Sequence, residues 1–359
     1  MQKGYAGRAW ATIQYNKVDI SESLKEYLLS VEYIDELTGK ADDLQLTLED
    51  PKFLWLSDWF PEKGSILQGS IITKYWNSPI EAEKGLDMGL FEIDEIEASG
   101  APNTVKIKAV SVPNNTTLRG VVHTKQWEKI TIEAIAKEKA DNAKLQLVYQ
   151  AEENPVLDRI EQTEQSDLAF LNKLCIDNGL ALKISAGTMV IMDEKELENE
   201  EPVICFIRPG KEEIINPIYN ANNESLKMLK VSQWSFSTSL RDVYKDCRVE
   251  YQKGKQKEKI VGTFTDPQKK EGKTLLVKEE VSSKEEAIRK AKKALRDKNK
   301  NEISARIQLQ GDTDIHSGLT VQVKGFGKFD GKYLMTSVKH RLTGGYTCDI
   351  SMRRCLVGY

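Results

Sequence analysis

Hydrophobic and polar residues alternate through most of the first 112 residues of the chain. In residues 43–48, leucine occupies every second position and a polar residue occupies each position between, which is the period of a half-buried β-strand. Turn-forming Gly, Pro, Asp and Asn separate six such stretches. They are TIQYNKVDIS, YLLSVEYIDE, DDLQLTLED, SILQGSIITKYW, GLFEIDEIEA and NTVKIKAVSV. Residues 1–112 are therefore predicted to form a first β-barrel or a sandwich.

Helical spacing replaces this alternation in residues 113–201. Thr131 is a suitable N-cap for one helix, because apolar residues follow it at intervals of three and four. Ser166 is a suitable N-cap for a second helix, which is predicted to end near Gly179. The segment after this glycine, LALKISAGTMVIMD, has the pattern of a hairpin that turns at Ala186. These features predict a small α+β insertion domain.

The remaining third of the chain returns to β-strand patterns. Residues 202–230 are rich in Pro, Gly and Asn and are predicted to be a connector. Residues 231–359 are predicted to form a second β-barrel domain with one helix at 283–298, where Ser283 starts a capping box. The lysine-rich stretch 253–273 is predicted to be a solvated loop. The predicted fold class is therefore mainly β, with two β-barrel domains and a small α+β domain.

Composition and charge exclude several classes of protein. The chain has 359 residues, 40% of them hydrophobic, which is enough for two or three domains and too many for a disordered protein. Its formal net charge of -3 gives no overall attraction for nucleic acid or for anionic membranes, so neither is expected as a partner. No apolar stretch approaches the roughly 18 residues of a membrane span, and the first residues do not form a signal peptide. We expect a chain that is made in the cytoplasm and stays soluble.

The residues that most often carry catalysis or bind metals are scattered. The five cysteines form no C-x-x-C pair, so reduced and mostly buried thiols are expected; they are Cys175, Cys205, Cys247, Cys348 and Cys355. The three histidines, His123, His316 and His340, lie outside any catalytic motif. Gly325, Gly327 and Gly331 are predicted to form a hairpin turn, because no helix follows them to bind a phosphate. No catalytic, cofactor-binding or metal-binding residue is predicted.

Acidic residues cluster at Glu161, Glu164 and Asp167. Paired carboxylates can act as the acid and base of a glycosidase. Two of the three, however, flank the predicted helix start at Ser166, where the helix dipole already favours negative charge. We interpret this cluster as structural.

Aromatic residues are dense in the segment DPKFLWLSDWFP. Phe53, Trp55, Trp59 and Phe60 are too closely spaced to share one face of a strand. One interpretation is an exposed apolar patch that contacts a neighbouring protein. The other is a barrel mouth whose aromatic side chains are all buried within the chain. The sequence leaves both open.

Three segments, in this order, resemble the phage late control protein D family. They are ADDLQLTLEDPKFLW, RIEQTEQSDLAFLNKLCIDNGLAL and GDTDIHSGLTVQVKGFGKFDGKYLMTSVKHRLTGGYTCDISM. The most specific pieces are EQSDLAFLNKL and the turn from Gly-Phe-Gly to Asp330-Gly331-Lys332-Tyr333. Members of this family are baseplate hub proteins of contractile phage tails and tail-like bacteriocins. The N-terminal part of type VI secretion spike proteins is similar.

The resemblance implies a structural protein that assembles as a ring. Family hubs are homotrimers in which each subunit contributes two tube-like β-barrel domains. Such a ring joins a hexameric tail tube protein to a trimeric central spike protein. Further partners implied are other baseplate proteins and, as an additional candidate, the tape measure protein. The chain ends at Tyr359, soon after the last predicted strand. The puncturing tip and any lysozyme-like domain are therefore expected on separate polypeptides.

Two alternatives remain open at this stage. The first is the same kind of hub in a type VI secretion system or another contractile injection system. The second is a cell-wall-binding or cell-wall-degrading tail component, because residues 127–150 faintly resemble a LysM peptidoglycan-binding module. That segment lacks the usual Gly-Asp-Thr start of the module, so sugar binding is not expected.

Overall fold

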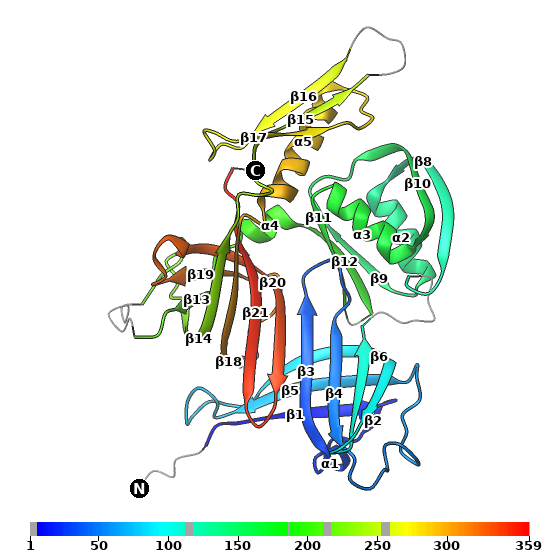
Figure 1. The fold of residues 1–359 in the computed structure, drawn as a ribbon, viewed down its shortest axis with the longest axis vertical. Coiled ribbons are helices and arrows are strands. Elements are labelled where there is room, and N and C mark those ends of the chain that lie inside the picture. Colours follow the sequence, from blue (N-terminus) through cyan, green and yellow to red (C-terminus); the bar gives the residue numbers. More distant parts are fainter. Residues whose placement is uncertain (1–5, 112–117, 186, 211–216, 253–258, 359) are drawn as a thin grey trace.

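The computed structural model describes residues 6–111, 118–185, 187–210, 217–252 and 259–358. Strands dominate these residues (Figure 1). The N-terminal elements are β1 (Arg8–Tyr15), β2 (Val18–Asp19), α1 (Ser21–Leu24), β3 (Leu28–Glu36), β4 (Asp43–Glu49), β5 (Ile66–Lys74), β6 (Lys84–Ser99) and β7 (Thr104–Val110). The insertion contains β8 (Val122–Thr131), α2 (Ile132–Asn142), β9 (Gln146–Gln150), β10 (Val156–Ser166), α3 (Asp167–Asp177), β11 (Leu180–Ser185), β12 (Thr188–Asp193) and α4 (Glu194–Asn199).

The C-terminal part contains a closed β-barrel. Its six strands pair in the order β19-β13-β14-β18-β21-β20, and β20 pairs again with β19 to close the ring of strands. These strands are β13 (Ile204–Ile207), β14 (Lys227–Thr238), β18 (Ile303–Gln310), β19 (Thr320–Lys324), β20 (Gly331–Leu342) and β21 (Tyr346–Arg354), with the short 3-10 turn η2 (Gly327–Phe329) between β19 and β20. The predictions of a mainly β fold and of a β-barrel are confirmed.

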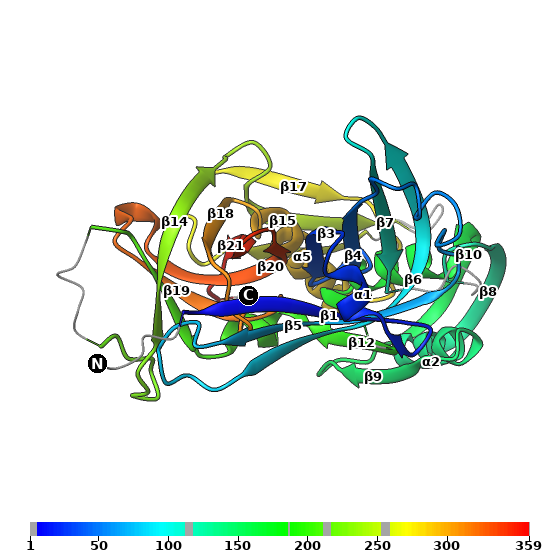
Figure 2. The ribbon, with the colours of Figure 1, turned by 90° about the horizontal axis from the view of Figure 1, so that it is seen from below.

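The N-terminal strands do not form a second closed barrel. In the described residues they pair in the order β3-β4-β7-β6-β5-β1-β2, and β3 continues the sheet by pairing with β20 of the barrel. Strand β3 pairs with β4 along one edge, and its residues Val31–Glu36 pair with β20 along the other. Strand β1 therefore cannot pair with β3 there to close a barrel. The prediction of two separate barrels is wrong in this respect. Figure 2, which views the molecule from below, shows β1 and β5 side by side.

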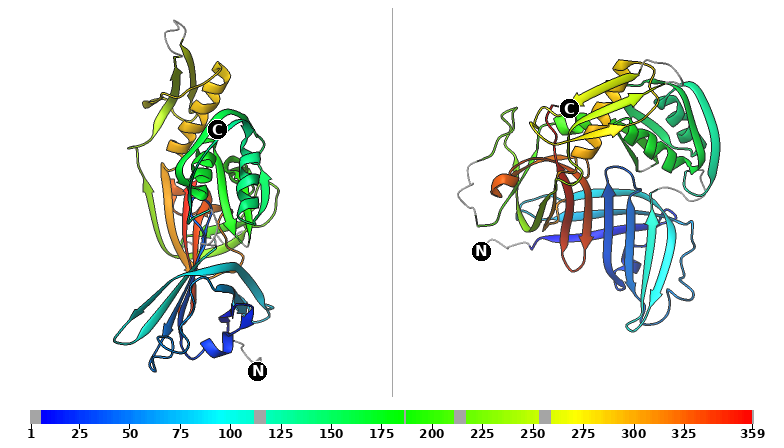
Figure 3. Two further views of the ribbon diagram at one scale, coloured as in Figure 1. Left: turned by 90° about the vertical axis from the view of Figure 1, so that its right-hand side faces the viewer. Right: turned by 45° about the horizontal axis from the view of Figure 1, so that its top comes forward.

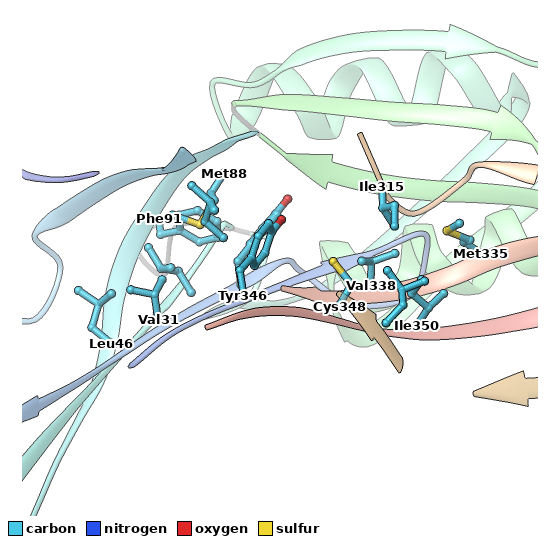
Figure 4. Close-up of a cluster of buried hydrophobic side chains, with 14 of the residues drawn as sticks. Val31, Leu46, Met88, Phe91, Ile315, Met335, Val338, Tyr346, Cys348 and Ile350 are labelled. Carbon is cyan, nitrogen blue, oxygen red and sulfur yellow. The ribbon is translucent and has the colours of Figure 1, made fainter. Parts of the chain in front are cut away.

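One hydrophobic core extends through both of these β-regions. It includes Phe91 of the N-terminal sheet and Tyr346 of the barrel, both almost fully buried (Figure 4). Tyr33 links the two sides, because its ring lies edge-on to Phe91 at 6.0 Å and stacks on His340 at 5.7 Å between ring centroids. The two β-regions thus share a core, and loss of packing in one should destabilise the other.

The insertion has a core of its own. Helices α2 and α3 are capped by Thr131 and Ser166, whose hydroxyl oxygens each accept a backbone N–H at 3.3 Å, where the sequence predicted the caps. The helices pack on β11-β12-β9, and β8 pairs with β10. The predicted hairpin is β11 and β12; its turn residue Ala186 lies outside the described residues.

A distal subdomain interrupts the barrel between β14 and β18. It contains β15 (Tyr244–Tyr251), β16 (Ile260–Thr265), β17 (Lys273–Val277) and α5 (Lys284–Asn299), with Ser283 as the N-cap of the helix. Figure 3 shows this subdomain at one end of an elongated molecule. The predicted solvated loop at 253–273 is wrong for 260–265, because β16 pairs with β15 and buries Gly262 against α5. Residues 253–258 lie outside the described residues.

The segment predicted to be a connector contributes a strand to the barrel. Within residues 202–230, β13 runs parallel to both β14 and β19, and all four of its residues are buried. An isolated bridge joins Tyr219 and Ser225 in the same segment. In the described residues, no helix is long and apolar enough to cross a membrane.

Candidate interface

The predicted aromatic segment lies on the connection between β4 and β5. Phe53, Trp59 and Phe60 are 55%, 44% and 51% exposed, whereas Trp55 is only 8% exposed. Leu56, between them, is also exposed. The interpretation in which all four side chains are buried within the chain is wrong, because three of them face solvent. The role of the segment as an interface stays a prediction.

Local hydrogen bonds give this connection a fixed shape. The buried carboxylate of Asp50 accepts the backbone N–H of Trp55 at 3.3 Å. The Ser57 hydroxyl donates to the Phe53 carbonyl at 2.6 Å, and the backbone N–H of Trp59 donates to the Leu54 carbonyl at 2.9 Å. Phe53 has a φ of 56°, in the left-handed region that most side chains avoid. The chain therefore turns sharply here and holds its apolar side chains outward.

Aromatic packing holds one of the three exposed rings, that of Trp59. The Trp55 and Trp59 rings meet edge to face at 5.5 Å between centroids, and Tyr27 contacts both at 6.2 and 5.8 Å. Because Trp59 is already held by two neighbours, a partner would pay little conformational entropy to bind it. An exposed, preorganised tryptophan is typical of residues that dominate binding energy at interfaces.

Sequence analysis missed a second group of aromatic side chains. Trp234 of β14 is 44% exposed, and its ring lies 5.6 Å from Phe326, which precedes η2. Phe236 contacts Phe326 and Phe329, both at 5.0 Å between centroids. The segment SQWSFST alternates Ser with large rings, so Trp234 and Phe236 share one face of β14. This alternation was the signal in the sequence that could have revealed the group. A strand with buried rings, however, has the same alternation.

Most of the acidic residues that the sequence singled out are held in ion pairs or hydrogen bonds. Asp167 is buried and accepts hydrogen bonds from the Lys139 ammonium at 2.7 Å and from Gln162 at 2.9 Å. Glu161 is exposed and pairs with Arg159, while Glu164 is exposed within the β-bulge between Gln162 and Gln165. The predicted acidic cluster is therefore not assembled into a pair of carboxylates that face each other across a cleft.

The histidines are also dispersed. His340 is fully buried, and its Nδ1 lies 2.7 Å from the Tyr346 hydroxyl and 3.3 Å from Cys348 Sγ. Burial lowers the pKa of His340 to about 4, so the ring is neutral at physiological pH. His123 lies on β8, and His316 lies in the turn before β19. The predicted hairpin turn at Gly325–Gly331 is present, with Asp330 accepting the backbone N–H groups of Gly325 and Phe326.

Cysteine burial agrees with the sequence. Cys175, Cys205, Cys247 and Cys348 are buried, Cys355 is half-buried, and all five are free. Burial raises the pKa of Cys175 and Cys348 to about 12, which makes these thiols poor nucleophiles. Within the described ranges, no three His, Cys, Asp or Glu residues are placed to hold a metal ion.

Two buried ionic clusters fix the insertion to the rest of the chain. In the first, called the Lys183 joint, the ammonium of Lys183 on β11 binds Asp35 of β3 and lies 3.6 Å from Asp42. It also donates to the Glu36 carbonyl at 2.8 Å and to the Ser317 hydroxyl at 3.1 Å. The insertion, the N-terminal sheet and the barrel therefore meet at one lysine.

The second cluster, called the Glu198 joint, lies on α4. Glu198 accepts hydrogen bonds from Arg296 of α5 at 2.5 Å, from Arg353 of β21 and from the backbone N–H of Leu356 at 2.9 Å. Glu194, one turn earlier, accepts a hydrogen bond from Arg353 at 3.0 Å. This joint ties the insertion, the barrel and the distal subdomain together.

Comparisons with known proteins agree with the sequence motifs. A search against models of protein families finds no match. A probable baseplate hub protein of Escherichia phage 186 is 27% identical over 183 residues, which is 49% of this chain and 43% of that protein. The chain thus spans less than half the length of this curated relative.

Solved structures extend the likeness to nearly the whole fold. The 43 kDa tail protein of prophage MuSo2 from Shewanella oneidensis superposes with a TM-score of 0.69 at 13% identity, covering 97% of this chain and 98% of that one. The E. coli c3393 protein, a component of the type VI secretion system, superposes with a TM-score of 0.54 at 12% identity, covering 91% and 73%. The predicted resemblance is confirmed: the chain is similar in sequence to phage baseplate hub proteins and has the fold of phage tail proteins.

Proposed function

We propose that the chain is the structural baseplate hub of a contractile phage tail or of a phage-tail-like bacteriocin. The observation that carries this proposal is the agreement of two comparisons. Sequence similarity points to a baseplate hub protein over half the chain, and the fold of a prophage tail protein extends over 97% of it. The role is mechanical and needs no turnover.

The proposed assembly is a homotrimeric ring at the end of the tail tube. Its partners are the tail tube protein on one side, the central spike protein on the other, and neighbouring baseplate proteins, with the tape measure protein as a further candidate. Support comes from the shared core of the two β-regions and from the two buried ionic joints. These features make the chain a stiff body, as transmission of force between tube and spike requires.

The exposed aromatic residues of the β4–β5 connection form the proposed interface. The side chains of Phe53, Trp59 and Phe60 expose apolar surface to solvent, and the buried ring of Trp55 packs edge to face against Trp59. Burial of three large rings against a neighbour would be strongly favourable, at about 25 cal/mol per Å² of apolar surface removed from water. A patch of this kind is costly on a free monomer and useful in an assembly.

The test is immunogold electron microscopy of particles pelleted from an induced culture of the source strain, with antibody against this chain. We expect label at the distal end of contractile tails, where tube meets baseplate. A capsid on the labelled particles distinguishes a phage from a bacteriocin. Absence of label from every particle would contradict the proposal.

A hub of a type VI secretion system is the second candidate function. It is favoured by the fold shared with the E. coli type VI component, which extends over 91% of this chain. The same antibody separates the two candidates, because label would then lie on cell-bound contractile structures and not on released particles.

A further inference from the structure

Strand β11 is the edge of the insertion that meets the rest of the chain. It lies at the end of the sheet β11-β12-β9, so only one of its sides pairs within the insertion. On the other side, the backbone N–H of Leu182 donates to the Thr38 hydroxyl at 3.1 Å. The Ser111 hydroxyl, which follows β7, donates to the Ile184 carbonyl at 3.0 Å. These contacts dock the insertion on the N-terminal sheet on either side of Lys183.

The Lys183 joint at the centre of this contact buries more negative than positive charge. Asp35 and Asp42 are 4% and 1% exposed, and one ammonium serves both. Ser317 supplies Asp35 with two further donors, its backbone N–H and its hydroxyl. Asp42 accepts the backbone N–H of Glu36 through Oδ1 at 2.9 Å, but its Oδ2 is buried without a hydrogen-bond partner among the described residues. Asp42 is therefore the less stabilised anion of the joint.

The charged groups around Asp42 do not compensate for its burial. Burial raises the pKa of Asp42 to about 6, because Lys183 of β11 offsets only part of the desolvation and Asp35 of β3 adds to it. Tyr33 of β3 also interacts with this carboxylate, but its hydroxyl stays neutral because burial raises its pKa. Ser111 accepts the backbone N–H of Asp42 at 3.0 Å and adds no charge. A proton on Asp42 would make the joint neutral.

The docking contact beside the joint is incompletely packed. An open cleft of about 500 Å³ lies between Gly39 of the β3–β4 connection and Asn172 of α3. A smaller void next to it is lined by Leu182 and Ile184, the two neighbours of the lysine in β11. Asn172 Oδ1 and Arg119 Nη1, both at the cleft, are buried with no hydrogen-bond partner in the part of the chain that the structure describes. Water could satisfy these atoms if the contact opened, so opening loses less than it would at a closely packed interface.

The insertion is held more firmly where it continues into the barrel. Helix α4 starts directly after β12 and carries the Glu198 joint, in which Arg296 and Arg353 neutralise the buried carboxylates. The Thr320 hydroxyl adds a hydrogen bond to the Glu200 carbonyl at 2.9 Å. The insertion thus has one balanced attachment and one unbalanced attachment. A body held in this way opens at the unbalanced attachment and pivots about the other.

We propose that the Lys183 joint is a proton-operated latch that controls how tightly the insertion docks on the N-terminal sheet. Asp42 takes up one proton from solvent in the docked state, and the contact tightens because the joint loses its unmatched negative charge. When the proton returns to solvent, the contact loosens and the insertion opens more often about the Glu198 joint. The acidity of the surroundings therefore sets the freedom of the insertion.

The direction of the response follows from the difference between the two states. Opening exposes Asp42 to water, where its pKa returns to the ordinary 3.8, whereas the docked value is about 6. The docked state therefore binds the proton more tightly, and docking weakens as the pH rises through about 6. These two values give a docking equilibrium that is about tenfold more favourable at about pH 5 than at about pH 7.5.

Amide hydrogen exchange of the full chain tests the latch. The amide of Leu182 reports docking directly, because its acceptor, Thr38, lies outside the insertion. Amides of β12, the central strand of its sheet, report the fold of the insertion itself. Rates are measured by NMR at about pH 5 and pH 7.5 and corrected for the intrinsic pH dependence of exchange. We expect Leu182 to be less protected than the β12 amides at both pH values, and its protection to fall about tenfold at the higher one.

Asp42→Asn removes the proton site and keeps the shape of the side chain. Its amide oxygen can still accept the backbone N–H of Glu36, and the group is neutral at every pH. We expect the protection of Leu182 to become independent of pH and, at about pH 7.5, to exceed that of the parent chain by about tenfold. Protection of the β12 amides confirms that the variant is folded.

Three control variants identify the proton site. Asp158→Asn changes an exposed carboxylate on β10 and should keep the full tenfold response. Glu36 and Asp43 are closer controls, because burial raises their pKa values as well. Glu36→Gln and Asp43→Asn should both retain most of the response. Loss of the response in either of them, with its persistence in Asp42→Asn, would overturn the assignment to Asp42.

Two other outcomes would also overturn the proposal. In the first, the corrected protection of Leu182 in the parent chain does not change with pH. In the second, Leu182 exchanges at the same rate as the β12 amides, which would mean that the insertion leaves the N-terminal sheet only when it unfolds. The experiment needs no tail tube or spike protein. Its failure therefore leaves the proposed function untouched.

Discussion

The two buried joints that hold the insertion differ in their charge balance. The Lys183 joint has two carboxylates, Asp35 and Asp42, and one ammonium, so one negative charge is not matched within it. In the Glu198 joint, two carboxylates face two guanidinium groups, and Lys300 lies 3.4 Å from Glu194. One carboxylate of the Lys183 joint can therefore take up a proton near neutral pH. In the Glu198 joint, each charged group is needed to neutralise another.

The pKa values in the Lys183 joint reflect this imbalance. Burial raises the pKa of Asp42 to about 6, because Lys183 offsets only part of the desolvation and the negative charge of Asp35 adds to it. For Asp35, burial acts in the same direction, but Lys183 and the hydrogen bonds from Ser317 outweigh it and lower the pKa. Two neighbouring carboxylates are thus shifted in opposite directions. A single lysine can stabilise only the nearer one as an anion.

The largest effect is expected from Glu198→Ala. This change leaves the guanidinium groups of Arg296 and Arg353 buried without their shared acceptor, and the backbone N–H of Leu356 loses its partner. Removal of one partner from a buried ion pair costs about 3–5 kcal/mol. Urea unfolding measures the loss. Glu196→Ala, on the same helix but half-exposed, is the control and should change stability by less than about 0.5 kcal/mol.

A smaller loss is expected from Lys183→Met. Asp35 keeps hydrogen bonds from the backbone N–H of Ser317 at 2.6 Å and from its hydroxyl at 2.8 Å, so the carboxylate is not left without donors. We expect a loss of about 2–3 kcal/mol at neutral pH, below that of Glu198→Ala. Lys173→Met, at an exposed position on α3, should be neutral. If Lys183→Met cost more than Glu198→Ala, the proposed difference between the joints would be wrong.

The third prediction concerns pH. Because the folded-state pKa of Asp42 is about 6 and its ordinary value is 3.8, the ionised form is disfavoured in the folded protein. This penalty is fully present above about pH 6 and is relieved as the pH falls towards 3.8. Asp42→Asn should therefore stabilise the protein by about 1–3 kcal/mol at about pH 8 and by nearly nothing near pH 4.

The difference in stability between Asp42→Asn and the parent chain separates the contribution of Asp42 from that of His340. The lowered pKa of His340, about 4 against an ordinary 6.5, contributes stability that is present above 6.5 and is lost as the pH falls from 6.5 to 4. His340 and Asp42 thus act in opposite directions over nearly the same range. His340 contributes equally to both proteins, so the difference between their urea-unfolding profiles reports Asp42 alone. A difference independent of pH would refute the assignment.

Local features of the fold could be predicted from the sequence. Thr131, Ser166 and Ser283 cap α2, α3 and α5 where the sequence placed them, because a cap and its N–H donor lie within three residues. Long-range pairing could not be predicted. Strand β13 lies among prolines and pairs with β19 more than a hundred residues away, and the continuation of the barrel through β3 and β20 joins segments about three hundred residues apart.

The candidate interface was predictable only in outline. The density of aromatic residues near Trp55 marked the segment, but the burial of Trp55 depends on Asp50 and Tyr27, whose positions follow from tertiary packing. The Trp234 group also draws on Phe326 from a turn far along the chain. Sequence alternation cannot distinguish such a group from a core.

The smallest effect is expected at an exposed ion pair that joins two of the same units as the Glu198 joint. Lys293 of α5 lies 3.2 Å from Glu153 of the insertion, and the Glu153 side chain is 58% exposed. A pair with an exposed carboxylate contributes about 0–1 kcal/mol, because water already solvates that carboxylate and salt screens the attraction. Glu153→Gln should therefore lower stability by less than about 1 kcal/mol, and the loss should vanish in high salt. A loss as large as that of Glu198→Ala would show that the contact between α5 and the insertion, and not the buried position of the charges, holds the two units together.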